Sequence, residues 1–240
     1  MKKILITGAS GGIGSSIADR FLKNKYEMIL TSSSDATLNK LKQKYGNNHH
    51  YYILDFKNPD QNNIILKKIS AEHRDLNVIV NNAGITDDSL LLRMKTNQWN
   101  SVIQANLTSN FTIIKALLPN MIKNKSGNII GVSSVVATSG NPGQSNYVAS
   151  KSGMIGLYKS IALEVAARNI NVNVISPGFI VSPMTDKLNE NQKNQILEKI
   201  PMKRFGHPNE IANLVFFLTS PESNYITGQN FHVNGGMLMV

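Results

Sequence analysis

The chain has 240 residues, of which 41% are hydrophobic and 17% charged, and this composition excludes a disordered protein. A chain of this length buries roughly 70–75% of its unfolded surface, so its core does not need covalent cross-links. The absence of cysteine excludes disulfides, thiolate metal sites and a cysteine nucleophile. The formal net charge of +10 fits either a solvated surface or an acidic partner, and charge alone does not identify that partner.

The first residues do not read as a targeting segment. Lys2 and Lys3 precede only four residues, 4–7, before a glycine-rich stretch, which is too short for a secretory signal. No apolar run reaches the 18 residues of a membrane span. We therefore expect a soluble protein without a membrane partner, located in the cytoplasm or in an organelle after import.

Short apolar runs typical of buried parallel strands alternate with stretches of helical periodicity. The predicted strands are residues 4–7, 28–30, 51–54, 76–80, 128–132, 172–175 and 231–233, and the predicted helices are residues 13–22, 64–69, 105–122, 148–167 and 210–218. Strands joined by helical crossovers form a parallel sheet covered on both faces. We expect one α/β domain over residues 1–240, a doubly wound Rossmann-type fold with a seven-stranded, mostly parallel sheet.

Two longer segments, residues 84–96 and 176–201, follow the fourth and sixth predicted strands. Ligands of open α/β sheets bind beyond the carboxyl ends of the strands, and long loops there are often functional. We expect these two segments to form the walls of a substrate site.

The first predicted strand leads directly into a turn with Gly8, Gly12 and Gly14, followed by a helix. In this context, backbone N–H groups and a helix N-terminus hold a pyrophosphate. The spacing differs from G-x-G-x-x-G, and such a turn also serves tight helix packing. Its place at the first strand–helix turn nevertheless predicts a nucleotide site, and the lack of a Gly-Lys-Ser/Thr sequence excludes a P-loop.

The second strand ends in a run of hydroxyl residues, 31–34, with no acidic residue at the position that usually binds a ribose 2′-hydroxyl. Such a run leaves room for a 2′-phosphate and therefore favours NADP over NAD. A plain polar turn remains an alternative, since no arginine is placed to contact the phosphate.

Candidate catalytic side chains gather near the predicted carboxyl edge of the sheet. Tyr147 and Lys151 are four residues apart, so they share one face of a helix. Ser134 follows the fifth strand, and Asn106 lies on the helix before it. The Tyr-x-x-x-Lys spacing alone is common on ordinary helix surfaces. The assignment of a catalytic role therefore depends on the combination of this pair with Ser134 and Asn106.

This combination resembles the short-chain dehydrogenase/reductase family over essentially the whole chain. The segments that carry the resemblance are residues 7–14 and 81–84, Asn106, Ser134, Tyr147-x-x-x-Lys151 and Pro177-Gly178. Within the family, residues 81–86, 143–147, 177–180, 225–228 and 232–237 are similar to bacterial reductases of 3-oxoacyl-[acyl-carrier-protein]. The resemblance implies NADPH-dependent reduction of the 3-oxo group to a 3-hydroxyl in fatty acid biosynthesis.

The resemblance also implies a role for each site residue. Tyr147 is expected as the general acid, Lys151 as the cation that lowers its pKa and holds the nicotinamide ribose, Ser134 as the group that polarises the carbonyl, and Asn106 as the holder of a relay water. The implied NADP(H) contacts are Gly8, Ser10, Gly11, Gly12, Ile13, Gly14, Ser33, Asp55, Phe56, Asn82, Ala83, Gly84, Tyr147, Lys151 and Ile180.

Two positions depart from the family pattern. Gly11 stands where many NADP-using members have Arg or Lys, and Ser182-Pro183 stands where related reductases often have Thr-Asp. The first removes one expected phosphate contact, and the second affects a loop over the substrate. Neither removes a catalytic group.

The expected partners are an acidic acyl carrier protein and further copies of the chain. Lys125 and Arg168 stand where similar reductases carry docking arginines, although cations at helix ends also occur without a partner. The apolar helices and the apolar residues 237–240 predict a homotetramer.

No basic helix or aromatic stripe indicates nucleic-acid binding. The five histidines show no metal-ligand spacing, so we expect them at the surface or in turns, without a metal.

Two alternatives remain open. One is a family member that acts on another small carbonyl or alcohol, because substrate loops diverge easily on one fold. The other is a non-catalytic nucleotide-binding protein. The reductase-like segments argue against the first alternative, and the combination of Asn106, Ser134, Tyr147 and Lys151 argues against the second.

Overall fold

Seven strands form one sheet in the order β3-β2-β1-β4-β5-β6-β7 in a computed structural model that describes residues 2–182, 185 and 189–240. All six neighbouring pairs are parallel, so the expected mostly parallel sheet is wholly parallel among these strands. The strands are β1 (Lys3–Ile6), β2 (Glu27–Ser32), β3 (His50–Ile53), β4 (Leu76–Asn81), β5 (Gly127–Val132), β6 (Ile170–Pro177) and β7 (Asn230–Val233). The order reverses between β1 and β4, where doubly wound sheets bind their ligands.

The helices of the described residues follow the predicted alternation. They are α1 (Gly12–Lys23), α2 (Asp35–Tyr45), α3 (Pro59–Glu72), α4 (Thr96–Ile103), α5 (Ser109–Asn124), α6 (Val136–Ser139), α7 (Ser145–Val165), α8 (Glu190–Glu198) and α9 (Pro208–Leu218). One π-helical turn, Gln104–Thr108, joins α4 to α5. Short 3-10 turns occur at Leu91–Arg93, Ala166–Arg168 and Pro221–Ser223. None of the described helices combines the length and the apolar character needed to cross a bilayer.

The sequence periodicity missed four of the described helices, namely α2, α4, α6 and α8. α2 buries only Leu38, Leu41 and Tyr45, and the rest of it is polar. α8 buries none of its residues and lies inside the segment 176–201 that we expected to be a loop. In α2 and α8 the apolar stripe is too narrow to give a clear helical period.

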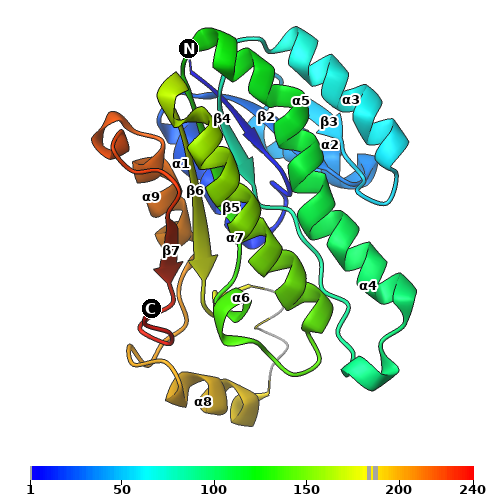
Figure 1. The fold of residues 1–240 in the computed structure, drawn as a ribbon, viewed down its shortest axis with the longest axis vertical. Coiled ribbons are helices and arrows are strands. Elements are labelled where there is room, and N and C mark those ends of the chain that lie inside the picture. Colours follow the sequence, from blue (N-terminus) through cyan, green and yellow to red (C-terminus); the bar gives the residue numbers. More distant parts are fainter. Residues whose placement is uncertain (1, 183–184, 186–188) are drawn as a thin grey trace.

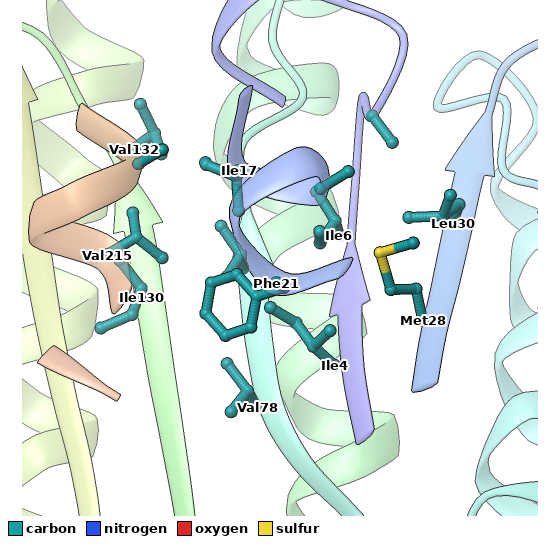
Figure 2. Close-up of a cluster of buried hydrophobic side chains, with 14 of the residues drawn as sticks. Ile4, Ile6, Ile17, Phe21, Met28, Leu30, Val78, Ile130, Val132 and Val215 are labelled. Atoms are coloured by element: carbon teal, nitrogen blue, oxygen red, sulfur yellow. The ribbon is translucent and has the colours of Figure 1, made fainter. Parts of the chain in front are cut away.

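Alternate side chains of each strand enter two separate cores. Ile4 and Ile6 face one side of β1 and pack with residues of α1, α2 and α9. Leu5 faces the other side and packs with residues of α3, α5 and α7. Figure 2 shows part of the first core, where Phe21 of α1 lies among strand residues such as Ile4 and Val78. In Figure 1, α5 and α7 cross the front of the sheet, and α8 lies beyond the ends toward which β6 and β7 point.

His73 lies in a turn, as expected, because its carbonyl oxygen accepts from the N–H group of Leu76 at 3.1 Å, but it is buried and not at the surface. Its side chain is only 3% exposed, and its ring centroid lies 4.3 Å from that of His50. The two residues are 23 positions apart in sequence, and only the folding of α3 against β3 brings them together. Spacing along the chain therefore carries no sign of the pair.

Candidate active site

The turn after β1 forms a cradle whose shape depends on two glycines. Gly8 has a φ of +64°, and a Cβ there would lie 2.9 Å from the Cα of Ala83. A Cβ at Gly14 would clash with the carbonyl oxygen of Gly8. Both positions therefore need glycine, since the backbone at Gly8 favours it and the space at Gly14 admits nothing larger.

Hydrogen bonds join this turn to the end of β4. The hydroxyl oxygen of Thr7 accepts from the backbone N–H groups of Asn82 and Ala83, both at 3.0 Å. The side-chain amide of Asn82 donates in return to the carbonyl oxygens of Thr7 and Gly8, at 3.0 and 3.2 Å. The two motifs, about 75 residues apart in sequence, thus form one rigid rim at the point where the strand order reverses.

A hollow of about 500 Å³ extends over this rim. The predicted cofactor residues that line it are Gly8, Ser10, Gly11, Gly12, Ile13, Gly14, Ser33, Phe56, Asn82, Ala83 and Gly84. Asp55 is not among its lining residues. Its carboxylate accepts a hydrogen bond from the N–H group of Lys57 at 3.1 Å, and its backbone carbonyl oxygen accepts one from Asn62 at 2.8 Å. Sequence reasoning did not assign Thr37 and Leu54 to this hollow, although Leu54 directly follows β3.

A second hollow, of about 630 Å³, adjoins the first and holds the candidate catalytic residues. Ser134, Tyr147, Lys151 and Ile180 line it. The two hollows share Ile13, Asn82, Gly84, Ile85 and Ser182, so they form one continuous cleft. A larger hollow of about 920 Å³ lies between α3 and α5 and contains none of these side chains. We place the site in the continuous cleft because the candidate catalytic side chains line it.

Helix α7 presents Tyr147 and Lys151 on one face, as the spacing predicts. The ammonium nitrogen of Lys151 lies 5.7 Å from the centroid of the Tyr147 ring. Lys151 is 3% exposed, and its ammonium donates to the carbonyl oxygen of Val132 at 2.7 Å. The end of β5 thereby fixes a buried cation beside the phenol.

Burial dominates the pKa values of both groups. It lowers the pKa of Lys151 to about 8, because an ammonium is poorly solvated inside the protein. It raises the pKa of Tyr147, the neighbouring Ser134 hydroxyl offsets part of this rise, and the charge of Asp88 adds to it. In this geometry the Ser134 hydroxyl is the group that lowers the pKa of Tyr147, and the net direction is upward. The expectation that Lys151 assists Tyr147 by lowering its pKa stays a prediction.

Asn106 lies in the π-helical turn and holds the loop after β4. Its Oδ1 accepts from the N–H group of Ile85 at 2.8 Å, and its Nδ2 donates to the carbonyl oxygen of Ile85 and to the hydroxyl of Ser150. Both amide protons are thus used within the protein, and the backbone carbonyl oxygen accepts from Asn110 at 2.8 Å. These bonds make the side chain a clamp for the loop. The expectation that Asn106 holds a relay water stays a prediction.

The loop after β4 forms one wall of the cleft, as predicted. Ile85 and Thr86 line it, and the N–H group of Ser89 donates to the carbonyl oxygen of Gly143 at 2.8 Å, which ties the loop to the start of α7. Ile180 and Ser182 form part of the opposite wall. Pro183, where the sequence departs from the family pattern, lies outside the described residues.

Lys125 and Arg168 precede two neighbouring strands at one edge of the sheet, away from the cleft. Lys125 ends α5 just before β5, and Arg168 closes a 3-10 turn just before β6. Since Gly127 pairs with Ile170, both cations lie at the amino ends of neighbouring strands. Tyr147 lies at the carboxyl ends, so within one chain the two cations are at the opposite edge of the sheet from it.

Comparisons with known proteins show which family this chain resembles. A family model described as enoyl-(acyl carrier protein) reductase matches residues 8–238. Proteins named 3-oxoacyl-[acyl-carrier-protein] reductase FabG are similar over nearly their whole length. The one from Vibrio cholerae is 46% identical (100% of this chain, 98% of that protein), that from Buchnera aphidicola 44% (98% and 96%), and that from Escherichia coli K12 46% (100% and 98%).

The parallel sheet, the glycine cradle and the Ser134–Tyr147–Lys151 edge together define a dinucleotide-binding oxidoreductase fold. The chain belongs to the short-chain dehydrogenase/reductase family. Membership implies a nicotinamide dinucleotide as cofactor, and the glycine cradle, which side chains would fill, fits a bound pyrophosphate.

Proposed function

We propose that this chain is an NADPH-dependent 3-oxoacyl-[acyl-carrier-protein] reductase of fatty acid biosynthesis, acting in the cytoplasm. The observation that carries the proposal is the meeting of Ser134, Tyr147 and Lys151 in a hollow continuous with the glycine cradle. The names of the similar proteins supply the substrate class.

The residues of the cleft suit proton delivery to a carbonyl oxygen. Bound NADPH supplies the hydride. The hydroxyl of Ser134 is placed to donate a hydrogen bond to the same oxygen as negative charge develops on it. Tyr147 holds its proton at neutral pH because burial raises its pKa, and this makes it a general acid for the nascent alkoxide. The buried ammonium of Lys151 then stabilises the phenolate that remains.

We propose NADPH over NADH because hydroxyl side chains surround the adenosine end of the cleft. Thr31, Ser32 and Ser33 line the first hollow, and no carboxylate does so among the described residues. A 2′-phosphate there meets hydrogen-bonding groups and no negative charge. The assay is the ratio of kcat/KM with NADPH and NADH on an acetoacetyl thioester, expected well above one.

The description of the matching family model suggests a second candidate, reduction of an enoyl thioester. The two reactions differ in the atom that takes the proton, since a ketone oxygen needs a hydroxyl-type acid beside it. The closeness of Ser134 to Tyr147 favours the ketone. Acetoacetyl and crotonyl thioesters, tested with the same enzyme and NADPH, separate the candidates, and faster crotonyl turnover contradicts the proposal.

We further propose a homotetramer and docking of acyl carrier protein across a subunit boundary. Large apolar side chains are exposed on one chain, including Phe111 of α5 at 48% and Leu163 of α7 at 87%. Docking at Lys125 and Arg168 requires the active site of a neighbouring subunit, because these cations lie at the edge opposite their own Tyr147.

Two measurements test this assembly. Light scattering of the full chain is expected to give four times the monomer mass, and a monomer contradicts the assembly. Changing Lys125 and Arg168 together to Glu is expected to slow turnover of carrier-bound substrate in a salt-dependent way, with little effect on a small thioester. Equal losses on both substrates contradict the docking surface.

A further inference from the structure

Three side chains that the reductase site does not use meet at the other end of the sheet. Glu27 is the first residue of β2, His50 is the first residue of β3, and His73 directly follows α3. One donor atom from each lies within 4.8 Å of the others. Within residues 2–182, 185 and 189–240, no other three His, Asp or Glu residues are grouped in this way.

The hydrogen bonds around His73 define which of its nitrogens carries the proton. Tyr52 has a single hydroxyl proton, and it donates this proton to the carboxylate of Glu72. The 2.9 Å bond between Tyr52 and Nε2 of His73 is therefore donated by the imidazole. Nδ1 then carries a lone pair, and it is buried without a hydrogen-bond partner among the described residues. A metal-bound histidine usually donates its other ring N–H group to an oxygen acceptor, and Nε2 of His73 donates in this way to the Tyr52 hydroxyl.

Glu27 and His50 already face each other. Their Oε1 and Nε2 atoms are 2.6 Å apart, and the proton between them belongs to the imidazole, since a carboxylate only accepts. Their side chains are 23% and 40% exposed, so solvent ions have access. A metal in place of this proton needs the two atoms to separate slightly, because Zn²⁺ binds N and O donors at about 2.0–2.2 Å from each.

The local charge also favours a cation. Three carboxylates, of Glu27, Glu72 and Asp75, lie around the cluster against two cations. Lys3 pairs with Glu27 and Asp75, and Lys68 pairs with Glu72 at 3.9 Å. Lys3 lies 3.0 Å from Asp75 and 3.5 Å from Glu27. If the Glu27 carboxylate turns to a metal ion, Lys3 keeps its shorter ion pair, the one with Asp75. Binding of the metal therefore leaves neither Lys3 nor Glu27 without a charged partner.

We propose that Glu27, His50 and His73 form a binding site for a borderline divalent transition-metal ion, of which Zn²⁺ is the expected example. Two imidazoles and one carboxylate are a donor set that Zn²⁺ accepts, with water in the fourth position. Mg²⁺ and Ca²⁺ prefer all-oxygen donors and are not expected there. The ion would link β2, β3 and the turn before β4, and it would stabilise the β3 edge of the sheet, opposite the reductase cleft.

The test is calorimetric titration of ZnCl₂ into the full-length, tag-free protein after treatment with a chelator. One Zn²⁺ per chain is expected, together with a higher Tm. Glu27→Gln and His50→Gln each are expected to weaken binding by about 10-fold or more, since even outer-shell partners contribute 10–100-fold. Both residues are partly exposed, so these variants are expected to fold, and their reductase activity in chelator is expected to match that of the unmodified chain.

His207→Gln is the matched control, because His207 is exposed and lies outside the cluster. It is expected to leave the Zn²⁺ affinity unchanged. The proposal is overturned if the unmodified chain binds no Zn²⁺, or if Glu27→Gln and His50→Gln bind it as tightly as the unmodified chain. It is equally overturned if His207→Gln weakens binding as much as they do, which indicates scattered surface binding, or if Mg²⁺ binds as well as Zn²⁺.

Discussion

The ammonium of Lys151 donates a 2.7 Å hydrogen bond to the carbonyl oxygen of Val132, the last residue of β5. This bond holds a cation in the interior next to the serines that follow the strand. The lowered pKa of Lys151, about 8, shows that burial disfavours its charge. The buried ammonium of Lys151, which the proposed reaction needs, therefore lowers the free energy of unfolding of the protein.

Replacing Lys151 with Met is expected to stabilise the protein at pH 7 while it abolishes reductase activity. The pKa of the folded state, about 8, lies below the ordinary value of 10.5, a difference worth roughly 3 kcal/mol. Loss of the bond to Val132 offsets about 1 kcal/mol of this. We expect the free energy of unfolding to rise by about 1–3 kcal/mol at pH 7, as measured by urea denaturation.

The pH dependence provides the check on this explanation. Between pH 8 and 10.5 the unfolded chain binds more protons than the folded one, so the stability of the unmodified protein rises with pH relative to the variant. The advantage of Lys151→Met should therefore shrink as the pH rises through 8. An advantage that stays constant from pH 7 to pH 10 means that packing, and not the buried charge, causes it.

Removal of the Tyr147 hydroxyl is expected to prevent the reduction step and to leave the binding of NADPH nearly unchanged. Tyr147→Phe keeps the ring beside Lys151 but removes the proton donor, so kcat is expected to fall by roughly 10²–10⁴-fold. Fluorescence titration with NADPH is expected to give a nearly unchanged Kd. Tyr225→Phe is the control, since Tyr225 is fully exposed. A Tyr147→Phe variant with near-normal turnover removes Tyr147 from the mechanism.

The choice between cofactors is best tested at Ser33. Ser32 also lines the cleft, but it is only 6% exposed, and a carboxylate buried there would disturb folding. Ser33 is exposed beside it, so Ser33→Asp places a negative charge against a 2′-phosphate in solvent contact. The NADPH-to-NADH ratio of kcat/KM is expected to fall at least tenfold. Ser33→Asn, similar in size and neutral, should change it much less, and equal effects of the two contradict the charge explanation.

A side chain at Gly84 is expected to displace its neighbours, because Gly84 lies between two functional groups. A Cβ there would be 3.1 Å from Oδ1 of Asn106 and 3.3 Å from the Lys151 ammonium. Gly84→Ala is expected to lower kcat by displacing one of them. Gly156→Ala, on α7 with open space around it, is the control and is expected to add roughly 0.5–1 kcal/mol of stability. Unchanged kcat in Gly84→Ala contradicts the tight fit.

The sequence by itself determined the strands and the face of the catalytic helix, because both depend on local periodicity. All seven predicted strands occur in the sheet. The inner strands are short and mostly apolar because both of their faces are buried, and the half-buried edge strands β3 and β7 still carry apolar residues. The four-residue spacing placed Tyr147 and Lys151 on one face of α7. The polar helices α2 and α8 lack such a signal, and the periodicity did not predict them.

Tertiary structure alone decided what each distant residue contacts. Asn106 clamps the loop at Ile85 because the π-helical turn aims its amide there, and no local pattern encodes that direction. The order of the strands places Lys125 and Arg168 at the edge opposite Tyr147. The same order gathers Glu27, His50 and His73 at the amino ends of the sheet. These contacts join residues far apart in the chain, so they exist only once the packing of the sheet and its helices sets the distances.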